Sequence, residues 1–152
     1  MSIGTAPAAL WRQVWRNLRA RRPAGAARRV PVMVLHRDCG SCNGCEIELR
    51  LAASIAHDAS RRGVGFVVAP AQAELLLVTG PVTFHSQAGL GATWDAMADP
   101  KQVVAVGDCA VDGGVFRGSY AVAGGVGSTL PVERMIRGCP PTARQILDGL
   151  MD

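Results

Sequence analysis

Residues 38–48 read Asp38-Cys39-Gly40-Ser41-Cys42-Asn43-Gly44-Cys45-Glu46-Ile47-Glu48 and place three of the chain's five cysteines within seven positions. Two residues separate each cysteine from the next, and the segment lies where an apolar run ends and a helix-like pattern begins. The other two cysteines, Cys109 and Cys139, also follow short apolar runs and lie among glycines. Spacing of this kind is typical of thiolates that share a metal centre. It predicts that four of the five thiols hold one iron-sulfur cluster.

Length and composition suit one domain with reduced cysteines. A chain of 152 residues with 49% hydrophobic content can bury a core of its own. The cysteine count is odd and no apolar signal segment precedes the cysteines, which favours an intracellular metal site over a secreted disulfide scaffold. No uninterrupted apolar run approaches the roughly 18 to 20 residues that cross a bilayer. The sequence therefore predicts a protein that is not integral to a membrane.

Positive charge is concentrated in residues 1–30, which hold seven arginines and no acidic residue, whereas the rest of the chain has nine basic and twelve acidic residues. Trp11, Val14, Trp15 and Leu18 recur at helical spacing, which predicts a short amphipathic helix. The division is a basic arm and linker at 1–29 and a folded domain at 30–152. The arm is either a partly disordered tail or a helix that docks on an anionic membrane surface or an acidic groove. Nucleic acid is a weaker alternative, because the body offers no basic platform.

Strand-like and helix-like segments alternate after residue 30. Apolar runs predict strands at 30–35, 64–68, 74–79 and 102–106, and helices are predicted at 44–61, 90–97 and 141–150. A long glycine-rich passage spans 113–127 and precedes a further segment at 130–136. The run Leu75-Leu76-Leu77-Val78 is typical of a strand covered on both faces of a parallel sheet. The alternation predicts an α/β fold with a doubly wound, flavodoxin-like parallel sheet.

The cysteines follow predicted strands in three separate places. Ligands of open α/β sheets bind at the carboxyl ends of strands, so the three loops are expected to converge at one edge. Neighbouring glycines let the backbone approach a cluster closely and direct N–H groups at sulfur. A tetrahedral zinc site is an alternative, although zinc sites usually show two close cysteine pairs. Buried free cysteines that pack as small hydrophobes are a further alternative.

Four ordered blocks carry a resemblance to a known family. They are Cys42-Asn43-Gly44-Cys45-Glu46-Ile47-Glu48, Ala73-Glu74-Leu75-Leu76-Leu77-Val78-Thr79-Gly80-Pro81-Val82-Thr83, Gly107-Asp108-Cys109-Ala110 with Gly113-Gly114-Val115-Phe116, and Gly138-Cys139-Pro140-Pro141. Over residues 30–150 the chain resembles the small 4Fe-4S subunit of energy-converting NiFe hydrogenases of the formate hydrogenlyase type, and the 20 kDa B subunit of NADH-quinone oxidoreductase (complex I). The resemblance implies a flavodoxin-like fold and one 4Fe-4S cluster. It implies Cys42, Cys45, Cys109 and Cys139 as the ligands.

The first cysteine pair favours the hydrogenase branch of this family. The complex I members that resemble this chain have two adjacent cysteines there, whereas the hydrogenase members have a spaced pair, as at Cys42 and Cys45. Cys39 departs from the commonest pattern of both branches. A pairing of Cys39 with Cys42 is therefore open, although Cys42 with Cys45 matches the family better and makes Cys39 the spare thiol.

Three acidic residues stand beside the expected ligands. Glu46 and Glu48 are interpreted either as an ordinary pair of acids in the first turn of a helix, or as a proton route or docking contact near the redox centre. Asp108 either tunes the cluster potential or caps a loop. His36 and His85 lie near predicted strand ends and could border the site, but the four cysteines make no histidine ligand necessary.

The resemblance implies a redox subunit of an oxidoreductase complex, in which the substrate chemistry belongs to a partner. The implied partners are a large hydrogenase-like subunit of the NiFe or 49 kDa type, a ferredoxin-like multi-cluster subunit, and integral membrane subunits. The implied location is peripheral, on the cytoplasmic side of the cell membrane. The alternatives are the 20 kDa subunit of a complex I-like NADH-quinone oxidoreductase and a zinc-stabilised interaction domain.

Overall fold

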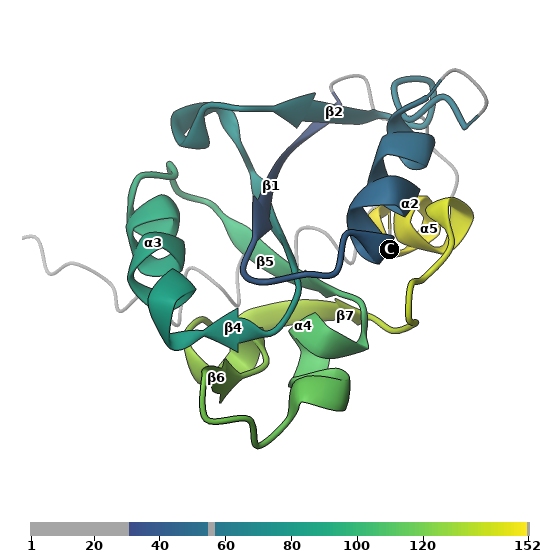
Figure 1. Cartoon of the computed structure of the whole chain (residues 1–152). Helices are drawn as coiled ribbons and strands as arrows, with labels where there is room; N and C mark the ends of the chain where they lie inside the picture. The colour runs from purple at the N-terminus through teal and green to yellow at the C-terminus, as the bar shows by residue number, and fades with distance from the viewer. Residues whose placement is uncertain (1–30, 55–56, 152) are drawn as a thin grey trace, which may run out of the picture.

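The computed structural model describes residues 31–54 and 57–151. Five parallel strands form the central sheet in the order β2-β1-β3-β5-β7 (Figure 1). They are β1 (Val32–Asp38), β2 (Val64–Val67), β3 (Leu75–Thr79), β5 (Gln102–Val106) and β7 (Val132–Ile136). This is the strand order of a doubly wound, flavodoxin-like sheet, so the predicted fold is confirmed. The predicted amphipathic arm lies outside the described residues.

Helices cover both faces of the sheet. On one face α2 (Gly44–Ala53) and α5 (Ala143–Met151) lie side by side, and on the other α3 (Phe84–Asp95) is the main cover (Figure 1). A short helix, α4 (Asp108–Asp112), follows β5 directly. The smaller elements are the antiparallel strands β4 (Val82–Thr83) and β6 (Val122–Gly124) and the 3-10 turns η1 (Pro70–Gln72), η2 (Gly114–Phe116) and η3 (Val126–Ser128).

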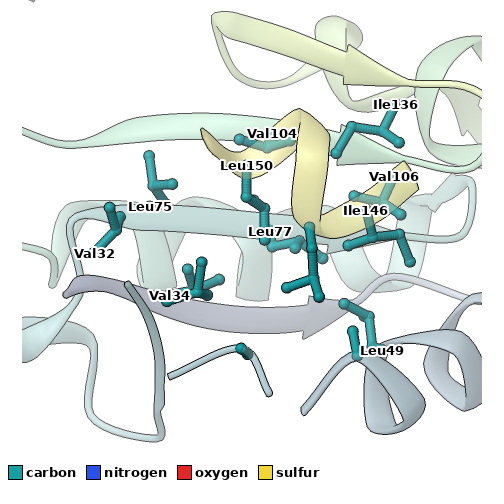
Figure 2. Packing of buried hydrophobic residues seen from close by; sticks show 14 of the residues in the cluster. Val32, Val34, Leu49, Leu75, Leu77, Val104, Val106, Ile136, Ile146 and Leu150 are labelled. Atoms are coloured by element: carbon teal, nitrogen blue, oxygen red, sulfur yellow. The ribbon is translucent and has the colours of Figure 1, made fainter. Parts of the chain in front are cut away.

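Strand β3 is the centre of the core, and all five of its residues are buried. Alternation along the strand sends Leu75 and Leu77 to the α2/α5 face and Leu76 and Val78 to the α3 face. Figure 2 shows the first face, where strand side chains meet Leu49 of α2 and residues of α5. Each fully buried leucine contributes about 1.5–3 kcal/mol to folding. The expectation of a strand covered on both faces is confirmed.

Helix α2 differs from its prediction in length and in orientation. It ends at Ala53 and not at residue 61, because the Ser54 backbone turns extended and the Ser54 hydroxyl donates to the Leu51 carbonyl (2.6 Å). Ile47 and Leu51, whose four-residue spacing predicts a helix here, face outward and are 60% and 43% exposed. The opposite side, which includes Leu49, packs on the sheet. Four-residue spacing marks a helix side, but only the tertiary contacts decide which side is buried.

Helix α3 begins six residues earlier than predicted. Thr83 and Ser86 form a capping box, in which the Ser86 N–H donates to Thr83 Oγ1 (3.1 Å) and the Ser86 hydroxyl accepts from the Thr83 N–H (3.0 Å). The helix is rich in small residues, which weakened its apolar periodicity in the sequence. Its early start brings Ser86 next to the cysteine loop, where its hydroxyl donates to the Cys39 carbonyl (2.9 Å).

Candidate metal centre

Three loops meet at the carboxyl edge of the sheet. Cys42 lies in the loop after β1 and Cys45 in the first turn of α2. Cys109 is the second residue of α4, directly after β5, and Cys139 lies between β7 and α5. The strand order β2-β1-β3-β5-β7 changes direction along the sheet between β1 and β3, and doubly wound folds bind ligands at such a switch point.

A carboxylate shapes the first cysteine loop. Asp38 Oδ1 accepts from the N–H groups of Gly40 (2.9 Å) and Ser41 (2.8 Å), which makes a tight turn at the end of β1. Burial acts to raise the pKa of Asp38, but these two hydrogen bonds outweigh burial and lower it. Asn43 then takes a left-handed conformation (φ 69°) and starts α2. The turn therefore sets the direction in which Cys42 and Cys45 leave the sheet.

The four predicted ligands share one electrostatic environment. Burial, followed by the charges of Glu46 and of the Cys109, Cys42 and Cys139 thiolates, raises the pKa of Cys45 to about 12. Burial also raises the pKa of Cys109, with Cys139 and Cys42 adding to the effect and an N–H bond from Val115 opposing it. Four thiolates so placed repel one another, so a bound cationic centre would favour their ionised form.

Two glycines let the backbone touch the thiols. Gly107 has φ 88° and ψ 152°, and a β-carbon added there would lie 2.6 Å from Cys45 Sγ. Gly114 has φ 51°, and a β-carbon there would lie 3.0 Å from Cys109 Sγ. A side chain at either position would fill this space. The two glycines therefore form a cradle of bare backbone around the sulfurs of Cys45 and Cys109.

Cys39 is not part of this group. It is 1% exposed and belongs to the core on the α3 face, together with Leu76 and Leu90. Burial raises the pKa of Cys39, and the opposing contributions come from Ser86 and Arg37. Its environment is that of a small buried hydrophobe.

The four thiols are neighbours without being packed around one point. Within 31–54 and 57–151, no three His, Cys, Asp or Glu side chains are grouped so as to hold a metal ion. A tetrahedral zinc site needs four donors about 2.0–2.3 Å from a single centre.

A buried polar chain lies behind Cys45. Glu46 is 8% exposed, and its Oε1 accepts a hydrogen bond from the Thr79 hydroxyl at the end of β3. His36 Nε2 lies 2.9 Å from Thr79 Oγ1 and 3.6 Å from Glu46 Oε1. Burial lowers the pKa of His36 despite the opposing charges of Glu46 and Asp38, so the ring is neutral at pH 7. Glu46 Oε2 is buried with no hydrogen-bond partner among the described residues.

This polar chain corrects one interpretation and adds one residue. Glu46 is not an ordinary solvated acid of a first helical turn, because its carboxylate points into the protein toward Thr79. Thr79 was missed by sequence reasoning. The signal for Thr79 was a hydroxyl at the end of an otherwise apolar strand, beside the expected site.

The fold and the site together define an α/β protein with a flavodoxin-like sheet and four cysteines presented by three loops at its carboxyl edge. Residues 42–152 match the model of the family described as NADH ubiquinone oxidoreductase, 20 Kd subunit. The chain belongs to this family, and the predicted resemblance is confirmed. The matched region begins at Cys42 and leaves Cys39 outside it.

Curated relatives come from both branches. Formate hydrogenlyase subunit 7 of Escherichia coli is 42% identical over 112 residues, which cover 74% of this chain and 44% of that protein. The probable membrane-bound hydrogenase subunit mbhJ of Pyrococcus furiosus is 41% identical, covering 78% of this chain and 71% of that protein. The NADH-quinone oxidoreductase B subunit of Phocaeicola vulgatus is 42% identical, covering 70% and 54%. The chain thus spans about half the length of some of these relatives. By name, they are subunits of oxidoreductase complexes.

Solved structures agree with the fold. A chain of the membrane-bound sulfane sulfur reductase, an archaeal respiratory membrane complex, superposes with a TM-score of 0.70 at 30% identity over 82% of this chain and 68% of that one. A chain of an NAD+-reducing NiFe hydrogenase gives 0.61 at 20% identity, over 80% and 90%, and shows the fold alone. Of the helices in the part of the chain that the structure describes, none has the length and apolarity to cross a membrane.

Proposed function

We propose that this chain is an electron-transfer subunit carrying one 4Fe-4S cluster held by Cys42, Cys45, Cys109 and Cys139. The cluster would lie next to the active site of a large catalytic subunit in a membrane-associated complex of the NiFe hydrogenase type. The observation that carries the proposal is the meeting of these four thiols, from three loops, in one electrostatic environment.

The donor set fits such a cluster in three respects. Thiolates are the usual ligands of iron-sulfur clusters, and a bound cationic centre would favour the ionised forms of Cys45 and Cys109, whose pKa values are raised by burial and by neighbouring thiolates. The glycines leave backbone rather than side chains against the sulfurs. The Val115 N–H already donates to Cys109. When bound, the cluster would accept and release one electron.

The residues of this chain would hold and insulate the cluster. Cys45 and Cys109 are recessed, whereas Cys42 and Cys139 are exposed, so one side of the site is closed by protein and the other is open. N–H donation to sulfur stabilises the reduced form, and the buried Glu46 charge opposes reduction. The chain's contribution is therefore binding, positioning and control of potential.

The zinc-stabilised interaction domain is less well supported. Zinc sites usually show two close cysteine pairs, whereas this chain has one close group of cysteines and two distant single cysteines.

The hydrogenase branch is favoured by the spaced pair Cys42 and Cys45, and the alternative is the 20 kDa subunit of a complex I-like quinone reductase. The relatives include both. Exposed apolar side chains on segments that follow the carboxyl ends of the strands support a large partner at this edge: Ile47, Phe84, Val115 and Tyr120. A ferredoxin-like multi-cluster subunit would exchange electrons with the chain. Integral membrane subunits would hold the assembly at the cytoplasmic side of the membrane, where the 1–29 arm would dock.

Anaerobic purification of the full chain, with iron, sulfide and zinc analysis and an EPR spectrum after dithionite reduction, tests the cluster. We expect about four irons and four sulfides per chain and a reduced S = 1/2 signal. Cys109→Ala should lose the four-iron centre, whereas Cys39→Ala, a matched cysteine outside the group, should keep it. One zinc without sulfide would contradict the proposal and support the interaction domain. Purification from the source cell separates the branches, since a hydrogenase partner carries two cysteine pairs for nickel and iron.

A further inference from the structure

The segment that carries Cys139 is held at both ends by carboxylates that come from the other two cysteine-bearing elements. We propose that Glu48 and Asp108 are positioning residues that fix Cys139 relative to the other thiols. The inference rests on the proposed cluster, and it assigns to Glu48 a hydrogen-bonding role rather than a role as proton carrier.

Glu48 fixes the C-terminal end of the segment. Its Oε2 accepts the backbone N–H of Ala143, the first residue of α5, at 2.7 Å and across 95 positions of sequence. Helix N-termini leave N–H groups without intrahelical partners. Thr142 Oγ1 accepts the Gln145 N–H (3.3 Å), and Glu48 accepts the Ala143 N–H. Because Glu48 lies three residues after Cys45 on α2, it ties the start of α5 to the helix that carries that thiol.

Asp108 fixes the N-terminal end. Its backbone N–H donates to the Gly138 carbonyl (2.9 Å), and its Oδ1 accepts the Gly138 N–H (3.2 Å). Both the N–H and the carbonyl group of Gly138 are therefore bonded to Asp108. Gly138 directly precedes Cys139, and Asp108 directly precedes Cys109. The Arg137 guanidinium lies 3.6 Å from the same Asp108 oxygen on the outer side.

Cys139 depends on these bonds more than the recessed thiols do. Cys139 and Pro140 are exposed, whereas Cys45 and Cys109 are partly enclosed. Pro141, two residues after the cysteine, is buried. Each end of the segment is hydrogen-bonded to a different element that carries a thiol. Glu48 links one end to the helix of Cys45, and Asp108 links the other end to the helix of Cys109. The position of Cys139 relative to Cys45 and Cys109 is thus set before any cofactor enters.

The conservative substitution separates positioning from charge. Glu48→Gln keeps a carbonyl oxygen that can accept the Ala143 N–H but removes the negative charge, whereas Glu48→Ala removes the acceptor. A positioning role predicts that the Gln variant resembles the wild type and the Ala variant does not. A role limited to proton transfer predicts that both variants lose proton-coupled activity and that neither changes hydrogen exchange or cluster lifetime. Asp95→Ala is the control, since Asp95 is exposed at the far end of α3.

The test uses the full chain, purified anaerobically, with two readouts besides activity. Hydrogen exchange followed by mass spectrometry should show amides of residues 142–144 exchanging at least tenfold faster in Glu48→Ala than in the wild type. A timed challenge with an iron chelator should remove the four-iron EPR signal several-fold faster in the same variant. Glu48→Gln and Asp95→Ala should stay within about twofold of the wild type in both, and thermal unfolding checks that every variant is folded.

Unchanged exchange and unchanged cluster lifetime in Glu48→Ala would overturn the inference, as would a Glu48→Gln variant as damaged as Glu48→Ala. Asp108→Ala offers a second route if Glu48→Ala does not fold, with amides of residues 138 and 139 as the exchange readout. A wild-type chain without iron or sulfide would overturn the proposed function and the cluster-positioning role together. A loaded wild type with insensitive variants would overturn the positioning role alone.

Discussion

Replacing Gly107 with alanine is the most direct test of the cradle around Cys45. Gly107 links β5 to α4 with φ 88° and ψ 152°, a region that is essentially restricted to glycine. Its missing β-carbon would lie 2.6 Å from Cys45 Sγ and 3.6 Å from the Gly138 carbonyl oxygen. Gly107→Ala therefore combines backbone strain with a collision at a proposed ligand.

The magnitude follows from these two contributions. The backbone conformation costs about 1–3 kcal/mol for a residue with a side chain. Ordinary contacts between non-bonded atoms are about 3.5–4.0 Å, so the sulfur or the backbone must retreat by about 1 Å, and overpacking of this kind costs about 1–3 kcal/mol. We expect a total destabilisation of about 2–6 kcal/mol and loss of the four-iron centre.

Two other glycines isolate the contributions. Gly118 also has positive φ (79°), but no described heavy atom lies within 4 Å of an added β-carbon, so Gly118→Ala carries backbone strain alone. Gly91 lies inside α3 with similar open space and no positive φ, so Gly91→Ala should stabilise by about 0.5–1 kcal/mol. Anaerobic denaturant unfolding gives the free energies, and iron analysis with EPR gives the cluster. A Gly107→Ala protein as stable as Gly118→Ala, with four irons and an unchanged spectrum, would refute the reasoning.

Three further predictions concern the core, acid stability and thiol reactivity. Leu77→Ala removes a fully buried side chain of β3 and should cost about 2–5 kcal/mol, seen as a lower denaturant midpoint with an unchanged m-value; a loss below about 1 kcal/mol would contradict the described packing. The Arg117 guanidinium lowers the pKa of Asp112 from 3.8 to about 2, so the ionised carboxylate stabilises the fold above pH 4 and this contribution disappears as the pH falls toward 2. Asp112→Asn should be less stable than the wild type at pH 7 and should lose less stability on acidification, and parallel pH profiles would argue against the ion pair. In the metal-free chain the pKa of Cys45, raised to about 12, should make its alkylation at pH 8 slower than that of the exposed thiols, which mass spectrometry can follow; equal rates would exclude the recessed setting.

The sheet was predictable because its signal is local. The apolar run that ends at Thr79 identified a strand covered on both sides, and the alternation of elements gave the topology. The orientation of α2 was not predictable, because it depends on tertiary contacts. One of them joins Glu46 to the Thr79 hydroxyl, 33 positions away. Its early end depends on a side-chain hydrogen bond from Ser54 that periodicity does not report.

The meeting of the cysteine loops was also predictable, since it follows from the positions of strand ends. The sequence does contain a signal for the burial of Cys39, but its regular spacing from the other cysteines obscured that signal. Its N–H bonds to the Thr79 carbonyl (3.0 Å), so it continues the alternation of β1, and it shares the α3 face with Leu35 four residues earlier. The bond from Glu48 to Ala143 spans 95 positions and has no counterpart in the local pattern.

Neither core cluster formed by the described residues includes Cys42, Cys45, Cys109 or Cys139. The sheet and its helices therefore have a complete apolar interior of their own, unlike zinc fingers, whose folding free energy is the metal's binding energy. Folding of this protein would therefore not depend on the proposed cluster. Because two of the thiols face outward, a cofactor delivered to the finished fold would enter from the side that a partner later covers. Maturation would then follow one order: chain, cofactor, complex.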